Sequence, residues 1–381
     1  MAADAKAKGR IASGADIVNL AAGEPDFPTP AAAAEAGKQA IADGLTKYGP
    51  AAGMTTLRHE IAAQTGVRTS TDVLPENVIV TMGGKHALMG AFRAVLNPDD
   101  EVVLTTPCWA STPDMVTLAG GRPVRVPTSS STQFLPTAAQ LEQAVTENTA
   151  ALCLCSPNNP TGAGWPRALI EAAVDLAVRH DLVIISDEVY RTLPFDDFQH
   201  VSPYELAPER TVIIDSVSKA FAMTGWRVGW AVAPPAIIAA MITLQSQTTS
   251  GVATINQVAA LSALRGDPST TELMRSAYQR RMQLVTMRLD GIAGIVCTRP
   301  RGAFYVFPDV SALYGMVTPQ GRAIRGSMDL QDHLLDAGVA VVAGAPFGDD
   351  RCIRLSFARG TKRLTLAMDR IEAFVASLSP S

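Results

Sequence analysis

A lysine with hydroxyl groups near it follows a short apolar run in the middle of the chain. Lys219 comes four residues after Thr211–Asp215, a β-branched segment typical of a buried strand. An amine among apolar neighbours is partly desolvated, and because desolvation lowers its pKa it can form an imine with a carbonyl group. Donors that a phosphate requires lie close by, in Ser216, Ser218 and Arg227.

A second anion site is predicted where residues 81–85 (TMGGK) open a helix. The first backbone N–H groups of a helix have no partner within it, so together with the helix dipole they favour a phosphate. A cofactor with both a carbonyl group and a phosphate would satisfy this site and Lys219, and pyridoxal 5′-phosphate (PLP) is such a molecule. Asp187, which also follows an apolar run, would be the acidic partner of its pyridine nitrogen.

The elements that must position these groups are strands that alternate with helices. Apolar runs at 77–81, 101–105, 150–156, 182–186 and 211–215 are separated by helical patterns. This order predicts an α/β fold with a mostly parallel sheet covered on both faces. Ligands of such sheets bind beyond the carboxyl ends of the strands. Four polar residues follow such ends and are expected to meet at one rim: Asn159, Asp187, Tyr190 and Lys219.

The length and the C-terminal pattern indicate two domains. At about 150 residues per domain, a chain of 381 residues is long enough for two. A long charged helix is expected from about residue 270, followed by strands and helices of an α+β tail. We therefore expect a large PLP-binding domain over residues 31–269 and a smaller domain made of residues 1–30 and 270–381.

The composition argues against several classes of protein. The chain is 47% hydrophobic and has a formal net charge of −4, so neither disorder nor a basic nucleic-acid-binding surface is expected. The charge-free stretch 228–264 contains Pro234-Pro235 and a polar run, which is unlike a membrane helix, and the first residues lack the apolar core of a signal peptide. Five scattered cysteines without a CxxC pair indicate a reduced, cytoplasmic protein, and the histidines never stand at metal-ligand spacing.

An ordered set of motifs across residues 20–360 resembles the class I/II aminotransferases, which are PLP enzymes of fold type I. The prokaryotic aspartate aminotransferase branch is the most similar. The matching segments are AAGEPDFPTP, KYGPAAGMTTLR, VTMGGKHAL, the region around Pro107-Cys108-Trp109, SPNNPTG, SDEVY, SKAFAMTGWRVG, RGAFYVF and RLSFA. The resemblance implies a large domain with a seven-stranded, mostly parallel sheet, a smaller α+β domain, and a homodimer with shared active sites.

The resemblance also implies roles around the cofactor ring. Lys219 would form the internal aldimine with PLP and then move a proton as general acid and base. Asp187 would pair with the pyridine N–H, Asn159 and Tyr190 would hydrogen-bond the phenolic oxygen, and Trp109 would stack on the ring. The phosphate ligands would be Gly84, the backbone of Lys85, Ser216, Ser218 and Arg227, with Tyr48 reaching the phosphate of the neighbouring subunit.

On the substrate side, the resemblance implies that Arg354 binds the α-carboxylate in bidentate fashion, helped by Asn159 and the backbone of Gly23. Lys85 stands at the position that would meet a distal carboxylate. Taken singly, these residues also have ordinary structural interpretations. Asp187 could be a helix cap, Trp109 could be core packing, and Arg354 could form a surface ion pair.

Two departures from the family pattern affect which substrates the site is expected to accept. The small residues Cys108 and Thr112 stand where aromatic residues are usual, which predicts a wider pocket near the ring edge. The N-terminal segment is about fifteen residues shorter than is usual in this branch, so a lid over the substrate is not expected. Both features put selectivity for dicarboxylates in question.

The leading hypothesis is an aminotransferase that exchanges an amino group between an α-amino acid, with aspartate or glutamate as candidates, and a 2-oxo acid. The alternative is elimination, replacement or cyclisation on an amino acid or sulfonium substrate with the same scaffold. The Ser216-x-x-Lys219 spacing also matches a serine acyl hydrolase, but the Ser-Asp-Asn and Lys-Thr-Gly motifs that such enzymes need are absent from the sequence.

Overall fold

A seven-stranded sheet is the largest feature of the computed structural model, which describes residues 2–380. The strands lie in the order β2-β8-β7-β6-β5-β3-β4, and only β8 runs antiparallel to its neighbours. Their bounds are β2 (Val78–Thr81), β3 (Glu101–Thr106), β4 (Arg122–Pro127), β5 (Thr149–Cys155), β6 (Val183–Asp187), β7 (Thr211–Ser216) and β8 (Gly229–Val232).

Helices cover both faces of this sheet because successive side chains of each buried strand point to opposite sides. Ile213 packs into one apolar cluster and its neighbour Ile214 into another. One face is covered by α4 (Gly84–Val95), α5 (Ser111–Leu118) and α9 (Pro235–Thr248). The other is covered by α3 (Thr55–Thr69), α6 (Ala138–Ala144), α7 (Arg167–Arg179) and α10 (Thr254–Leu264), on which α2 (Ala31–Ala42) packs.

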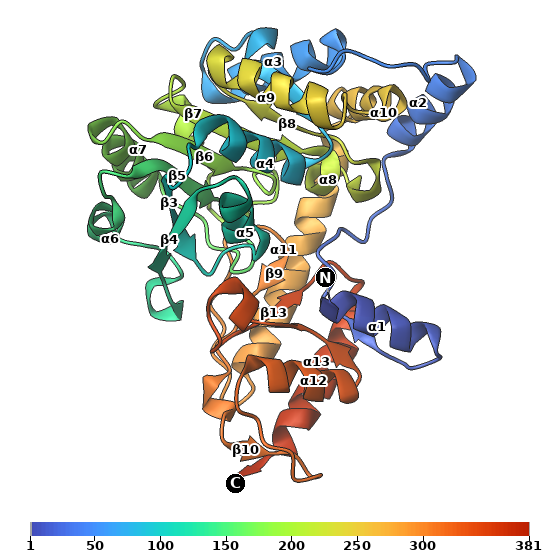
Figure 1. Cartoon of the computed structure of the whole chain (residues 1–381). Helices are drawn as coiled ribbons and strands as arrows, with labels where there is room; N and C mark the ends of the chain where they lie inside the picture. Colours follow the sequence, from blue (N-terminus) through green and yellow to red (C-terminus); the bar gives the residue numbers. More distant parts are fainter. Residues whose placement is uncertain (1, 381) are drawn as a thin grey trace.

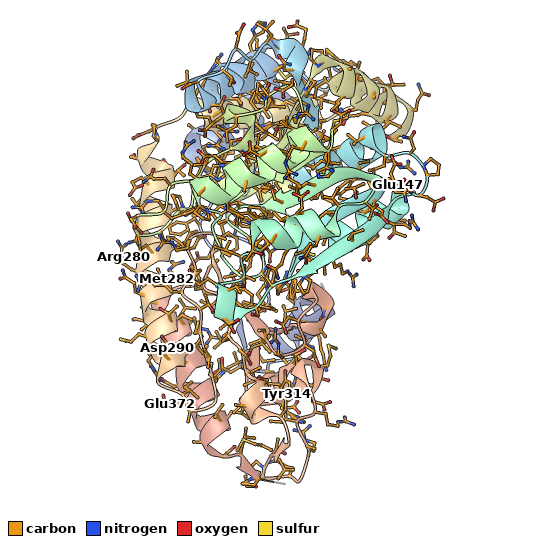
Figure 2. The ribbon with its side chains drawn as sticks, turned by 90° about the vertical axis from the view of Figure 1, so that its left-hand side faces the viewer. Glu147, Arg280, Met282, Asp290, Tyr314 and Glu372 are labelled. Carbon is orange, nitrogen blue, oxygen red and sulfur yellow. The ribbon has the colours of Figure 1, made fainter. Side chains whose placement is uncertain are left out.

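The C-terminal third forms a second packed region below the sheet (Figure 1). It contains a three-stranded sheet, β12-β13-β9, between longer helices. The elements are α11 (Ser269–Asp290), β9 (Tyr305–Val306), α12 (Ser327–Asp336), β12 (Val342–Ala343), β13 (Ile353–Ser356) and α13 (Thr361–Ala376), with a peripheral pair β10 (Met316–Val317) and β14 (Ser379–Pro380). Figure 2 shows α11, marked by Arg280, Met282 and Asp290, running from the large sheet down into this region.

The start of the chain packs with its end. β1 (Val18–Asn19) pairs in parallel with β11 (Val339–Ala340), and α1 (Ala2–Ala12) lies beside this pair. Two ion pairs join α1 to α12: Lys6 with Asp332 at 2.8 Å and Arg10 with Asp336 at 3.0 Å. Val18 and Leu20 thus share an apolar cluster with side chains of α11, α12 and α13.

The α/β fold with a mostly parallel sheet is confirmed, but the antiparallel strand β8 was not expected. It begins the charge-free stretch 228–264, where apolar residues are too continuous for periodicity to separate strand from helix. The strands expected in the α+β tail are present but short: β9 spans only Tyr305–Val306, and β11 and β12 have two residues each. Within residues 2–380, no helix combines the length and apolarity that crossing a bilayer requires.

Candidate active site

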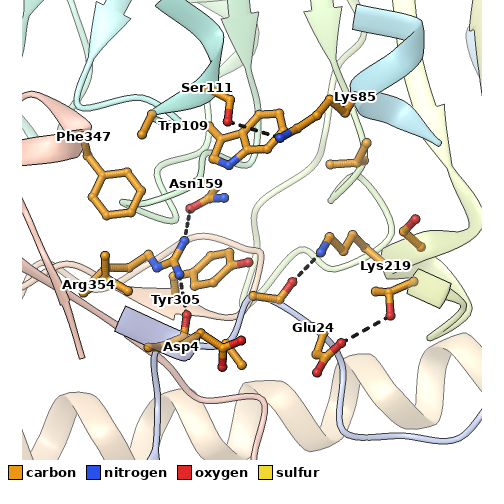
Figure 3. Close-up of a pocket in the computed structure, with 18 of the residues that line it drawn as sticks. Asp4, Glu24, Lys85, Trp109, Ser111, Asn159, Lys219, Tyr305, Phe347 and Arg354 are labelled. Carbon is orange, nitrogen blue, oxygen red and sulfur yellow. Dashed lines mark hydrogen bonds between the residues drawn. The ribbon is translucent and has the colours of Figure 1, made fainter. Parts of the chain in front are cut away.

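A cavity of about 620 Å³ lies where the carboxyl ends of the central strands face the C-terminal region (Figure 3). The four residues expected at one rim, Asn159, Asp187, Tyr190 and Lys219, all line it. Most of the other predicted ligands do so as well, namely Gly23, Gly84, Lys85, Trp109, Ser216, Ser218, Arg227 and Arg354. Segments separated by more than 300 residues thus contribute to one site.

Lys219 lies in α8 (Val217–Ala220), the short helix that directly follows β7. Ser216 caps this helix, since its hydroxyl accepts a hydrogen bond from the backbone N–H of Ser218 at 3.3 Å. The Lys219 amine donates to the carbonyl oxygen of Gly23. Burial and then the positive charge of Arg354 lower the pKa of Lys219 to about 8. At pH 7 roughly a tenth of these amines is therefore neutral, and so nucleophilic, which is far more than for an ordinary lysine.

Asp187 ends β6, which lies between β5 and β7 in the sheet. One carboxylate oxygen accepts a hydrogen bond from the N–H of Val189 at 3.3 Å. Burial raises the pKa of Asp187 to about 7, and the negative charges of Asp215 and Glu188 act in the same direction. The ionised form of this carboxyl group would be stabilised by a cationic ligand group placed against it, such as a protonated ring nitrogen.

Two hydroxyl groups meet beside Lys219. The Tyr190 hydroxyl lies 3.1 Å from that of Tyr305, which comes from β9 in the C-terminal region. Burial raises the pKa of both phenols, so both stay protonated and can donate a hydrogen bond to a ligand oxygen. The Lys219 amine lies 6.0 Å from the centre of the Tyr190 ring.

Glycines bring an arginine against the start of α4. Gly83 has a φ of +84°, and a Cβ on it would lie 2.5 Å from the guanidinium Nη2 of Arg227. A Cβ on Gly229 would lie 2.5 Å from the backbone of Gly83 and Gly84. Only glycine therefore allows this close approach. The result is a cradle of backbone N–H groups, serine hydroxyls and a guanidinium group, which fits a phosphate.

Arg354 of β13 is buried between two aromatic rings. Its guanidinium carbon lies 4.6 Å from the ring centre of Tyr305 and 5.0 Å from that of Phe347. One terminal nitrogen donates to the side-chain oxygen of Asn159 at 3.0 Å, and the other donates to the carbonyl oxygen of Ala21 at 2.8 Å. The buried Nε has no hydrogen-bond partner within residues 2–380. The guanidinium is thus held in place with a donor to spare, as an arginine that binds a carboxylate should be.

Lys85, in the first turn of α4, points to another part of the cavity. Its amine lies 3.3 Å from the Ser111 hydroxyl and 4.5 Å from the centre of the Trp109 ring. Burial and the neighbouring Arg227 lower the pKa of Lys85. No carboxylate in the described part of the chain forms an ion pair with any of four cationic side chains of the cavity, which are Lys85, Lys219, Arg227 and Arg354.

Not every expectation matches the cavity. Tyr48 lies outside it, with 98% of its surface exposed. Neither Cys108 nor Thr112 is among the residues that line it, and Thr112 is buried. No contribution of the N-terminal segment was expected, but Ala3, Asp4 and Lys8 of α1 form part of the cavity wall.

Several cavity residues were not identified from the sequence. Tyr305 stands in the quoted RGAFYVF segment, but its role depends on a contact with Tyr190 that spacing does not reveal. Phe347, Met328 and Gln331 come from the C-terminal region, and only packing brings them to the cavity. The described residues contain no cluster of three or more side chains suited to hold a metal ion.

The donor set fits PLP on four counts. It offers a buried amine of lowered pKa, a carboxylate for a ring nitrogen, phenols for a ring oxygen, and a phosphate cradle. The indole of Trp109 also lines the cavity and offers a flat surface for a ring.

Comparisons with known proteins agree with this geometry. The family model described as aminotransferase class I and II matches residues 15–371. An aspartate/prephenate aminotransferase of Cereibacter sphaeroides is 43% identical over 98% of this chain and 95% of its own length. An aspartate aminotransferase of Geobacillus stearothermophilus is 39% identical over 97% of this chain and 94% of its own. A solved structure of the Thermus thermophilus aspartate aminotransferase with maleate superposes with a TM-score of 0.92 at 41% identity, covering 98% of this chain and 95% of that one.

Proposed function

The chain belongs to the class I and II aminotransferase family and is a PLP-dependent aminotransferase of fold type I, and we propose that it acts on dicarboxylic substrates. Its amino donor would be aspartate or glutamate and its acceptor a 2-oxo acid with a second carboxylate. The relatives are named for aspartate and, in several cases, for prephenate. The alternative of an elimination or cyclisation enzyme gains no support from these relatives.

The observation that carries the proposal is the number and spacing of the cations without carboxylate partners. Besides Lys219, three cationic side chains line the cavity without a carboxylate partner among the described residues: Arg354 is buried, and Lys85 and Arg227 are exposed to the cavity and solvent. Together they make the cavity electropositive, which favours a ligand with several negative charges. Arg227 lies at the phosphate cradle, Arg354 between the aromatic rings, and Lys85 beside Ser111. PLP supplies one anionic group and a dicarboxylic substrate supplies two.

We assign the following work to the residues of the chain. When bound, PLP supplies a carbonyl group that condenses with an amine and a ring that withdraws electrons from the substrate carbon. Asp187 would accept a hydrogen bond from the ring N–H and keep that nitrogen protonated. Asn159 and Tyr190 would donate to the phenolic oxygen. Lys219, whose pKa lies near neutrality, takes a proton from the substrate Cα and returns one to the cofactor side.

The remaining ligands orient the two molecules. The phosphate would be held by Gly84, the backbone of Lys85, Ser216, Ser218 and Arg227, and Trp109 would lie against the ring. Arg354 binds the α-carboxylate with help from Asn159 and the Gly23 backbone, and Lys85 binds the distal carboxylate. Since Met328 and Phe347 add apolar surface, a bulkier acceptor of the prephenate type is compatible with the same cavity.

The proposed assembly is a homodimer with shared active sites. Residues 41–50, which include Tyr48, are all exposed in the single chain. In the dimer, the Tyr48 hydroxyl of one subunit would reach the phosphate in the other. We also propose the division into a large domain (residues 31–269) and a small one (residues 1–30 and 270–381), and a cytoplasmic location.

The test of the function follows the absorbance of the bound cofactor. Purified protein mixed with aspartate should convert PLP to pyridoxamine phosphate, and adding a dicarboxylic 2-oxo acid should reverse the change. Release of ammonia without this conversion would favour the elimination alternative. A screen of amino acids that found equal kcat/KM for aspartate and alanine would contradict the proposed dicarboxylate preference.

A further inference from the structure

A buried ion pair lies directly behind the site, outside the cavity. Nε of Arg191 donates to Oδ2 of Asp215 at 2.7 Å. The side chains are 21% and 3% exposed, and neither lines the cavity. Such a pair is expensive to bury, so its position calls for an explanation.

Asp215 is one residue beyond Ile214, which is the register partner of Asp187 between β7 and β6. Because side chains alternate along a strand, Asp215 points to the face opposite Asp187. Its second oxygen, Oδ1, accepts a hydrogen bond from the backbone N–H of Ser216 at 2.7 Å. One carboxylate thus both fixes Ser216 and places a negative charge behind Asp187.

Arg191 is anchored to the same turn as Asp187. Its backbone N–H donates to the carbonyl oxygen of Glu188 at 2.9 Å, so the turn after β6 carries the arginine that closes on β7. Glu188 likewise has an ion-pair partner, Arg68, at 3.0 Å. Each buried carboxylate next to Asp187 therefore has its own arginine.

We propose that Arg191 is a positioning residue for the cofactor: its ion pair with Asp215 cancels a negative charge behind Asp187 and holds Ser216, so that Asp187 and Ser216 can bind the ring nitrogen and the phosphate of PLP. The inference deepens the proposed function and rests on its assignment of Asp187. Without Arg191, the charge of Asp215 would oppose both the ionised form of Asp187 and the phosphate. The titratable groups close enough to interact electrostatically with Asp187 are Lys219, Glu188, Tyr190, Cys153 and Cys155, together with Asp215 behind it.

The test titrates the visible absorption of the holoenzyme, which changes as the nitrogen linking Lys219 to PLP gains or loses a proton. Arg191→Gln leaves an extra negative charge, which stabilises the protonated form, so the midpoint should rise by about 0.5–1 pH unit, less than a charge in direct contact would cause. Asp215→Asn leaves an extra positive charge and should lower the midpoint by a similar amount. The double variant should return close to the wild type, as should Arg191→Lys.

Arg210→Gln is the matched control. Arg210 comes just before the other end of β7, and its side chain is similarly buried at 19% exposed, but its carboxylate partners Asp181 and Glu209 lie at the surface. Its loss should lower thermal stability without moving the midpoint. Opposite shifts in the two single variants, cancelled in the double variant, cannot come from loosened packing.

An unmoved midpoint in Arg191→Gln holoenzyme, or shifts of the same sign in both single variants, would overturn the inference. If Arg191→Gln does not fold, the inference is tested with Asp215→Asn and the double variant. An unmoved midpoint in Asp215→Asn would overturn the inference equally. Absence of any titration in the wild type would overturn both this inference and the proposed roles of Asp187 and Lys219. An unmoved variant midpoint overturns the inference alone.

Discussion

Arg354 donates a hydrogen bond of 3.0 Å to the side-chain oxygen of Asn159, although 195 positions separate the two residues. The bond crosses from β13 in the C-terminal region to the loop after β5 in the large sheet. Both residues are assigned to the α-carboxylate of the substrate, so the geometry of this pair governs how a substrate amine is presented to Lys219.

Arg354→Lys should therefore lower kcat/KM for every α-amino acid. The ammonium group keeps the charge but loses the planar fork and its aromatic stacking, a loss of about 1.5–3 kcal/mol, or about 10–100-fold. Steady-state kinetics with aspartate and a monocarboxylic amino acid measures this, and the absorption of bound PLP should not change. Arg351→Lys, at a residue paired with Asp349 outside the cavity, is the control. A loss confined to aspartate would contradict the assignment.

Lys85→Met should raise KM for aspartate by about 10–100-fold and KM for phenylalanine by less than about threefold, because only the first substrate has a distal carboxylate. The control is Lys8→Met. Lys8 also lines the cavity, but it already pairs with Asp4 at 2.9 Å. Equal effects of the two substitutions on KM for aspartate would argue against Lys85 as the selective cation.

Asp187→Asn should change how the stability of the cofactor-free protein depends on pH. The pKa of Asp187 is raised from 3.8 to about 7 on folding, so the folded chain holds a proton there that the unfolded chain has released between these values. The stability that this proton contributes is present below about pH 4 and is lost as the pH rises through 7. The free energy of unfolding of the wild type, relative to the variant, should fall by roughly 2–4 kcal/mol over that range. Urea unfolding at pH 4.5, 5.5 and 7 measures the difference, and parallel pH profiles would contradict the expected shift.

Lys219→Ala should abolish covalent attachment of PLP and lower transamination by at least about 10³-fold, since both the nucleophile and the proton carrier are lost. Borohydride reduction followed by peptide mapping should locate the modified lysine at 219 in the wild type and find none in the variant. A reduced adduct on Lys85 instead would reassign the reactive amine.

The central residues of the site could be predicted from the sequence, because each of them follows a strand that the local pattern of apolar residues identifies. Asn159, Asp187 and Lys219 each follow a buried parallel strand, and parallel strands end at the same edge of a sheet. No comparable rule places Tyr305 or Phe347, since packing between distant parts of the chain brings them to the cavity.

The contribution of α1 was missed for a different reason. Its residues include five alanines and alternate charged groups without a clear apolar face, so periodicity does not show what it packs against. The ion pairs of Lys6 and Arg10 with α12 decide its position. The pair Arg191–Asp215 was also hidden, because 24 residues separate its members and neither lies in a motif with an assigned function.

The pairing of β1 with β11 has a consequence for biosynthesis. Residues 18–19 leave the ribosome early, but their partners at 339–340 and the donor Arg354 are among the last to be made. A nascent chain that ends before residue 339 lacks both the pairing partner of β1 and the arginine assigned to the substrate α-carboxylate. The complete site can therefore form only after nearly the whole polypeptide has been synthesised.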